Sequence, residues 1–143
     1  MTKLFFSSAI IASALVAGCG SVINKSYSGS GGMTAYNIKP EVYTHHYTKG
    51  FTGVDAYGWD PNLQFAWSRI GAAKTCGINF DQEKAIDQLQ AKYEISKVAH
   101  EIAGIDFHHM QSKKVAGFCT QERINEIQKY MPNFLSGNFP KIY

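Results

Sequence analysis

The ten residues 100–109, HEIAGIDFHH, begin like the helical motif of zinc proteases. In that motif two histidines four residues apart bind the metal, and the glutamate after the first acts as the base. Here the residue four positions after His100 is Gly104, whose side chain offers no ligand atom. On a continuous helix His108 lies about 80° around from His100, so the two converge only if the helix breaks at Gly104. We therefore interpret His100 and Glu101 as an exposed helical pair and predict no catalytic zinc site.

Two pairs of adjacent histidines, His45-His46 and His108-His109, are the next candidates for a metal site, and Met110 follows the second pair. Imidazole and thioether ligands together suit copper, so a copper-type metal-binding protein is an alternative interpretation. Adjacent side chains point to different faces of a helix, and nothing in the sequence shows that the two pairs meet. We favour surface histidines near a helix end, where an imidazolium interacts well with the helix dipole, and predict no bound metal.

Other catalytic motifs are missing from the sequence. It has no GxSxG motif of a hydrolase, and Cys76 and Cys119 are too far apart for the CxxC motif of a redox enzyme. The SGSGG stretch at 28–32 lacks the lysine and the preceding strand of a phosphate-binding loop. The carboxylates are scattered, with no pair that the sequence brings together as a glycosidase needs. We predict no catalytic residue, no cofactor and no enzymatic activity.

The N-terminal 18 residues have the pattern of a secretory signal peptide, with Lys3 before an apolar stretch at 4–16. That stretch is shorter than the roughly 20 residues that a membrane-spanning helix needs. It runs into VAGC at 16–19, which resembles the lipobox of bacterial lipoproteins. The resemblance implies that residues 1–18 are a signal peptide and that Cys19 becomes the acylated, palmitate-bearing first residue. An ordinary secreted protein is the alternative.

The resemblance also implies where the protein lies. Acyl chains on Cys19 would attach it to a membrane, since two chains already hold a protein stably. Gly20 follows the cysteine, where an aspartate would suggest retention in the inner membrane. We therefore expect a lipid-anchored protein that faces the periplasm, from the outer membrane if the host is Gram-negative.

The chain has three cysteines, and an odd number of cysteines in an exported chain needs an explanation. Lipidation of Cys19 would leave Cys76 and Cys119 as a pair in a compartment where disulfides persist. We predict a disulfide between them. It would close a separation of 43 residues, which the chain-entropy model values at roughly 4 kcal/mol. Two buried free thiols are the alternative.

Composition divides the rest of the chain into a linker and one domain. Residues 19–32 end in SYSGSGG and predict a flexible, lipidated tether. Residues 33–143 are enough for a single globular domain with a modest core. The net charge is +3, and removal of the signal peptide, whose one charged residue is Lys3, leaves +2. A charge so low and so dispersed predicts no nucleic-acid partner.

Residues 33–59 are rich in aromatic side chains and show no helical stripe. We predict short strands or an irregular segment here, with Val42-Tyr43-Thr44 as the best strand candidate. Tyrosine and tryptophan often anchor protein interfaces, so this segment is the candidate binding arm. The alternative is that the rings pack over the helices. The predicted partner-binding residues are Tyr43, Tyr47, Phe51, Tyr57 and Trp59.

From residue 60 to 143 the signals are helical. N-cap residues, apolar side chains at three- and four-residue spacing, and glycine or proline stops predict four helices. Together they predict a mainly α fold, a small bundle of about four short helices stapled by one disulfide. The first helix begins at Asp60-Pro61 and ends at Cys76-Gly77, the second is capped by Asp81, the third runs from Ile95 to about Met110, and the fourth runs from Thr120 to Pro132.

These features predict a non-enzymatic, membrane-anchored lipoprotein that binds another protein at the cell envelope. Its size, helices and single disulfide loosely resemble immunity proteins that neutralise the toxins of neighbouring bacteria. An accessory role in a secretion or pilus apparatus is also compatible with them. The alternative of a different class is a copper-binding lipoprotein that uses His45, His46, His108, His109 and Met110.

Overall fold

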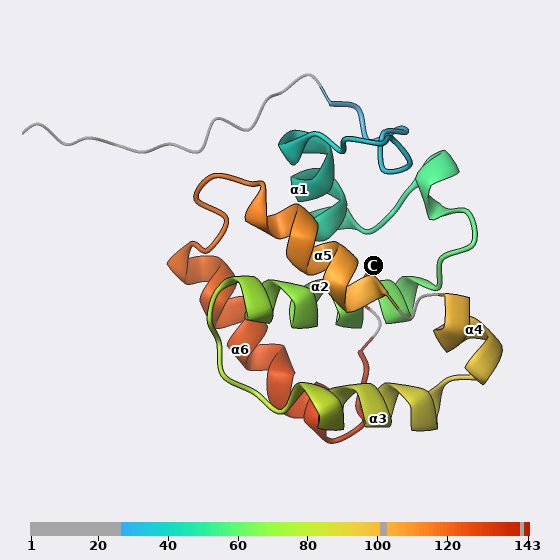
Figure 1. Ribbon diagram of the computed structural model, residues 1–143, viewed down its shortest axis with the longest axis vertical. Coiled ribbons are helices and arrows are strands. Elements are labelled where there is room, and N and C mark those ends of the chain that lie inside the picture. Colours follow the sequence, from blue (N-terminus) through green and yellow to red (C-terminus); the bar gives the residue numbers. More distant parts are fainter. Residues whose placement is uncertain (1–26, 101–102, 141) are drawn as a thin grey trace, which may run out of the picture.

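A computed structural model describes residues 27–100, 103–140 and 142–143, and these residues are mainly helical, without a strand (Figure 1). The prediction of a mainly α fold is confirmed. The signal peptide, Cys19 and the start of the tether lie outside the described residues. None of the described helices is long and apolar enough to span a bilayer. The elements are α1 (Pro40–Lys49), a 3-10 helix η1 (Gly53–Ala56), α2 (Pro61–Thr75), α3 (Gln82–Lys92), α4 (Ile95–His100), α5 (Gly104–Lys113) and α6 (Gln121–Leu135).

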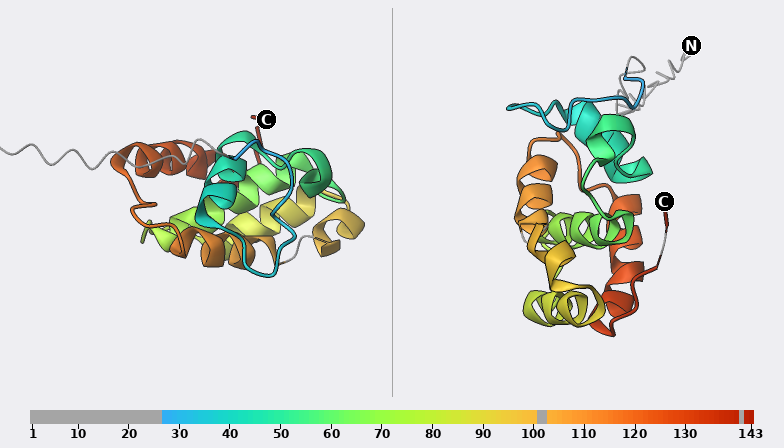
Figure 2. Two further views of the ribbon diagram at one scale, coloured as in Figure 1. Left: turned by 90° about the horizontal axis from the view of Figure 1, so that it is seen from above. Right: turned by 90° about the vertical axis from the view of Figure 1, so that its right-hand side faces the viewer.

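Helix α2 is the centre of the fold. Asp60 caps it by accepting hydrogen bonds from the N–H groups of Asn62 (2.9 Å) and Leu63 (3.3 Å), and Pro61 stands at its first position. Every residue from 63 to 73 is buried, because other elements cover the helix on all sides. Helices α5 and α6 pack on opposite sides of it, and α3 lies below against α6 (Figure 2, right).

Helices α2 and α5 cross closely because a glycine stands at each contact point. A Cβ atom added to Gly71 of α2 would lie 2.6 Å from the carbonyl oxygen of Ile105 and 2.7 Å from the Cβ of His108. A Cβ atom added to Gly104 of α5 would lie 2.5 Å from Cδ1 of Trp67. All three distances are shorter than a real Cβ atom allows, so the close approach of the two helices depends on these two glycines.

Replacement of Gly71 by alanine is therefore expected to destabilise the protein, although the same change in an open helix gains about 1 kcal/mol. The added methyl group would meet the backbone of α5, which cannot move aside without disturbing the core. We expect a loss of about 2–3 kcal/mol in the free energy of unfolding, measured by urea titration. A gain in stability would show that α5 can withdraw from α2 without cost.

The prediction of strands or irregular chain for residues 33–59 is wrong at Val42-Tyr43-Thr44, because these residues lie in α1. Pro40 at the first position and Gly50 at the end, with a φ of 80°, delimit this helix. Its buried positions, Val42, Tyr43, His46 and Tyr47, follow helical spacing. This buried stripe is hard to detect in the sequence because one of its members, His46, counts as polar.

The predicted third helix is two helices. α4 ends at His100 and α5 begins at Gly104, while Glu101 and Ile102 lie outside the described residues. α4 packs against α3, whereas α5 packs against α2 and α1, so one straight helix could not make both sets of contacts. Gly104 is thus the start of a helix rather than a weak point in the middle of one.

The prediction that Pro132 stops the last helix is wrong, since α6 continues to Leu135. Proline removes one backbone hydrogen bond, but its own conformation remains helical. The extra turn buries Phe134 completely, and this packing outweighs the lost bond. The N–H groups of Ser136 and Gly137 then close the helix with bonds to the carbonyl oxygens of Asn133 and Phe134, respectively.

The described part of the predicted tether, residues 27–32, lies against the domain. The hydroxyl of Tyr27 lies 2.8 Å from Nε2 of His46. Gly29 has a φ of 82°, and a Cβ atom there would lie 2.7 Å from Nε2 of His45. This glycine therefore serves a turn and a close contact, both of which a larger residue would disturb.

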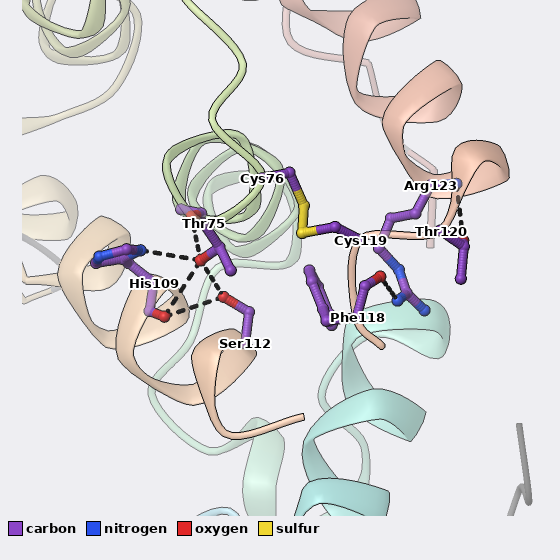
Figure 3. Close-up of a disulfide and its surroundings, with 9 residues drawn as sticks. Thr75, Cys76, His109, Ser112, Phe118, Cys119, Thr120 and Arg123 are labelled. Atoms are coloured by element: carbon purple, nitrogen blue, oxygen red, sulfur yellow. Dashed lines mark hydrogen bonds between the residues drawn. A yellow bond between two sulfur atoms is a disulfide. The ribbon is translucent and has the colours of Figure 1, made fainter. Parts of the chain in front are cut away.

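The predicted disulfide between Cys76 and Cys119 is confirmed. It joins the end of α2 to the residue before the cap of α6, with 5.5 Å between the Cα atoms (Figure 3). Next to the bridge, Arg123 packs on Phe118, with its guanidinium carbon 4.1 Å from the centre of that ring. The bridge thus holds the loop between α5 and α6 against the central helix.

Candidate functional site

Tyr43 and Tyr47 of the predicted binding arm lie in the core, each with a side chain 1% exposed. The Tyr43 hydroxyl donates to the carbonyl oxygen of His108 at 3.1 Å and lies 3.2 Å from the Nδ1 atom of its ring. The Tyr47 ring packs at 5.2 Å on Phe118. Direct contact of these two tyrosines with a partner is therefore a wrong prediction, because no partner can reach the rings in the folded protein.

The other predicted partner-binding residues keep part of their surface. Phe51 and Trp59 are partly exposed and pack edge to face, with ring centres 5.0 Å apart. Phe107 of α5, also partly exposed, continues the row with its ring centre 6.1 Å from that of Trp59. We call these three residues the aromatic edge. Their mutual packing holds the rings in place before any partner arrives.

A second exposed apolar group lies at η1. Val54 is 71% exposed and Tyr57 is 92% exposed, and both line a shallow surface depression with Gly53 and Ala56. Tyr36, in the neighbouring segment 27–39, is fully exposed. We call Tyr36, Val54 and Tyr57 the exposed patch.

Asp55 fixes the segment that carries this patch, because its carboxylate points inward and is 1% exposed. Oδ1 accepts a hydrogen bond from the backbone N–H of Met33 at 3.1 Å, and Oδ2 lies 3.2 Å from Nε2 of His46. The hydroxyl of Thr52 donates to the carbonyl oxygen of Gly29 at 2.7 Å. Two stretches more than 20 residues apart are thus joined at the surface.

His46 is fully buried, and polar groups surround its ring. Nδ1 donates to the carbonyl oxygen of Gly50 at 2.9 Å, since a carbonyl only accepts. Nε2 lies 2.8 Å from the hydroxyl of Tyr27, which donates to the carbonyl oxygen of Gly31. The same Nε2 atom lies 3.2 Å from Oδ2 of Asp55, so the ring and the carboxylate form one buried pair. Burial keeps this pair away from any substrate, so its role is to clamp the surface segments.

The histidines of the copper alternative are engaged separately. His45 stacks edge to face on Tyr27 at 5.1 Å, while Nδ1 of His109 lies 2.9 Å from the hydroxyl of Thr75 (Figure 3). His46 faces Asp55, His108 is buried beside Tyr43, and Met110 is 55% exposed. Within the described ranges, no three His, Cys, Asp or Glu side chains lie together in a way that could hold a metal ion.

His108 is completely buried, and the fold shifts its pKa strongly. Its complete burial, aided by the charge of Arg69, lowers its pKa from 6.5 to about 3. The folded protein therefore keeps this ring neutral, whereas the unfolded chain protonates it below about pH 6.5. The stability that depends on the neutral ring is present above pH 6.5 and is lost as the pH falls toward 3.

We expect the His108→Gln variant to be less stable than the wild type at pH 7 but less sensitive to acid. Between pH 6.5 and 4 the wild type should lose up to about 1.4 kcal/mol per pH unit through this one group. The variant lacks that contribution. Urea titrations at each pH give the free energy of unfolding, and its slope against pH is then compared between the two proteins. His109→Gln is the control, because His109 is partly exposed and its pKa is only moderately lowered by burial. Equal slopes of unfolding free energy against pH in wild type and His108→Gln would contradict the lowered pKa of His108.

Arg69 belongs to no sequence motif, yet it is buried to 3% exposure in the structure. Its guanidinium lies 4.2 Å from the ring centres of both Tyr47 and Phe65, and it donates to Glu126 at 2.7 Å. The available signal was that Arg69 is the single charged residue between positions 61 and 73 of this helical stretch. Its partners lie far away in the sequence, up to 74 residues at Tyr143, so no local pattern predicts these contacts.

These contacts give the buried polar groups structural roles, and the aromatic edge and the exposed patch are candidate surfaces for contact with another molecule. Comparison with known proteins adds no family to this description. No protein-family model matches the chain, and no curated protein or solved structure matches it.

Proposed function

We propose that this protein is a non-enzymatic lipoprotein, anchored through acylated Cys19, that binds another protein at the cell envelope. The lipobox-like VAGC at residues 16–19 supports the anchor. The Cys76–Cys119 disulfide supports export, because such bonds persist in oxidising compartments such as the periplasm. In a Gram-negative host the domain would face the periplasm from the outer membrane.

The aromatic edge is the observation that carries the proposal of partner binding. Interface hot spots are rich in aromatic side chains that lie in well-packed surroundings and present a face to the partner. Phe51, Trp59 and Phe107 meet this description, since each is partly exposed and each ring is held by another of the three. The edge joins the loop after α1 to α5, so the helical core supports it.

Acylation is tested with the Cys19→Ala variant. In cells given a clickable palmitate analogue, the wild type should be labelled and found in the membrane fraction. The variant should remain as unprocessed precursor without label. Labelling of the variant at the wild-type level would refute the anchor.

Partner binding is tested by photo-crosslinking in intact cells, with the crosslinker placed at Phe107, followed by mass spectrometry. The Trp59→Ala variant should reduce the crosslinked product, because it removes the middle ring of the edge. Ile95→Ala is the matched control, since Ile95 is an exposed apolar residue (83%) on α4. Thermal unfolding of each variant shows whether the domain remains folded. Equal crosslinking in the wild type and a folded Trp59→Ala variant would contradict the edge as the binding surface.

A further inference from the structure

We infer that the exposed patch, Tyr36 with Val54 and Tyr57, rests on the lipid surface and orients the domain on the membrane. This inference depends on the proposed acylation of Cys19. It goes beyond the anchor, because a lipid chain alone attaches a protein without choosing which face meets the bilayer.

The length of chain between the lipid and the domain limits where the membrane can be. Seven residues separate Cys19 from Tyr27. Even a fully extended chain places Tyr27 within about 28 Å of the lipid-bearing residue. Tyr27 is itself held on the domain by its bonds to Gly31 and His46. The end of the domain that carries Tyr27 is therefore the end nearest the bilayer.

The exposed patch belongs to this same end. Residues 27–39 and α1 occupy one end of the long axis, and α3 occupies the other (Figure 1). The view from above looks directly onto this face (Figure 2, left). The bonds from Met33 to Asp55 and from Thr52 to Gly29 tie η1 to the N-terminal segment, so η1 lies at the same end of the domain as the segment that carries Tyr36.

The chemistry of the patch fits a lipid headgroup region. Tyrosine is enriched at membrane interfaces, where its ring meets acyl chains and its hydroxyl meets water. Two of the three patch residues are tyrosines, and the third, Val54, is purely apolar. Residues 27–38 contain no charged side chain. The carboxylate of Asp55 is turned inward to His46, so no exposed acid from η1 would repel an anionic lipid.

The consequence is a defined orientation. The acyl chains supply the attachment energy, and the patch supplies a second point of contact that stops the domain from rotating about its tether. α3 would then point away from the bilayer.

The orientation can be measured on the full mature lipoprotein in nanodiscs of phosphatidylethanolamine and phosphatidylglycerol that contain a gadolinium-chelating lipid. Paramagnetic relaxation enhancement of backbone amides reports which residues lie near the headgroups. We expect the enhancement at residues 36, 54 and 57 to exceed that at Leu89 of α3 severalfold. A uniform enhancement, or a larger one on α3, would overturn the inference.

A triple variant, Tyr36→Ser with Val54→Ser and Tyr57→Ser, should remove the difference while the protein stays in the nanodisc. These side chains are exposed, so the melting temperature should change little. The control is Ile95→Ser with Met110→Ser, two exposed apolar residues outside the patch, which should keep the wild-type pattern. A triple variant that keeps its orientation but loses crosslinking to a partner protein would assign the patch to that partner and overturn the lipid contact.

Failure of this inference can be told from failure of the proposed function. If the mature protein carries no acyl chains and does not enter the nanodisc, the proposed anchor itself is contradicted. Acylated protein that enters but shows uniform enhancement contradicts only the orientation.

Discussion

The Arg69→Ala variant is expected to lose about 3–5 kcal/mol in the free energy of unfolding, because it removes the centre of a buried polar network. The guanidinium donates to the carbonyl oxygen of Tyr47 at 2.7 Å, to the hydroxyl of Tyr143 at 2.6 Å and to Glu126 at 2.7 Å. After truncation the Tyr47 carbonyl and the Tyr143 hydroxyl lose this donor. The rings of Tyr47 and Phe65 also lose the group packed between them.

Urea unfolding monitored by circular dichroism measures this loss. Lys74→Ala is the matched control, since Lys74 lies on the same helix and pairs with Asp106 at 3.0 Å. That pair is exposed, with 40% and 69% of the side-chain surfaces accessible, so its loss should cost less than about 1 kcal/mol. Arg69→Lys should recover only part of the loss, because an ammonium cannot reproduce the planar fork of donors. Similar stabilities for Arg69→Ala and Lys74→Ala would contradict the central role of Arg69.

Removal of the disulfide, by Cys76→Ala together with Cys119→Ala, is expected to cost roughly 4 kcal/mol. The bridge spans 43 residues, a stretch that contains α3, α4 and α5. Without it the unfolded chain gains conformational entropy, while the folded contacts of α2, α5 and α6 remain. The helical content should therefore be unchanged and the urea midpoint lower.

Reduction of the wild-type protein provides an independent measure of the same quantity. Reduced wild type and the double variant should have similar unfolding midpoints, both well below that of the oxidised protein. Equal midpoints for oxidised and reduced wild type would show that the disulfide does not stabilise the fold. A large fall in the variant alone would instead indicate damage to the packing around Phe118.

Local hydrogen bonds explain why much of the helical part was predictable from the sequence. Asp60, Asp81 and Thr120 each cap a helix by accepting from an N–H group two or three residues ahead. Such bonds depend on neighbouring residues alone, so residue type and spacing are sufficient to predict them. The disulfide was predictable by counting, because the proposed lipidation of Cys19 would leave two cysteines for one bond.

Tertiary contacts decided the rest, because each depends on residues far apart in the chain. His46 counts as polar in a sequence pattern, and only Asp55 and Tyr27 make its burial in α1 possible. The predicted third helix is divided into α4 and α5 because the two pack against different helices. Among the candidate site residues, burial separated Tyr43 and Tyr47 from Tyr57. An aromatic residue serves a core or an interface equally well, so its type alone cannot say which.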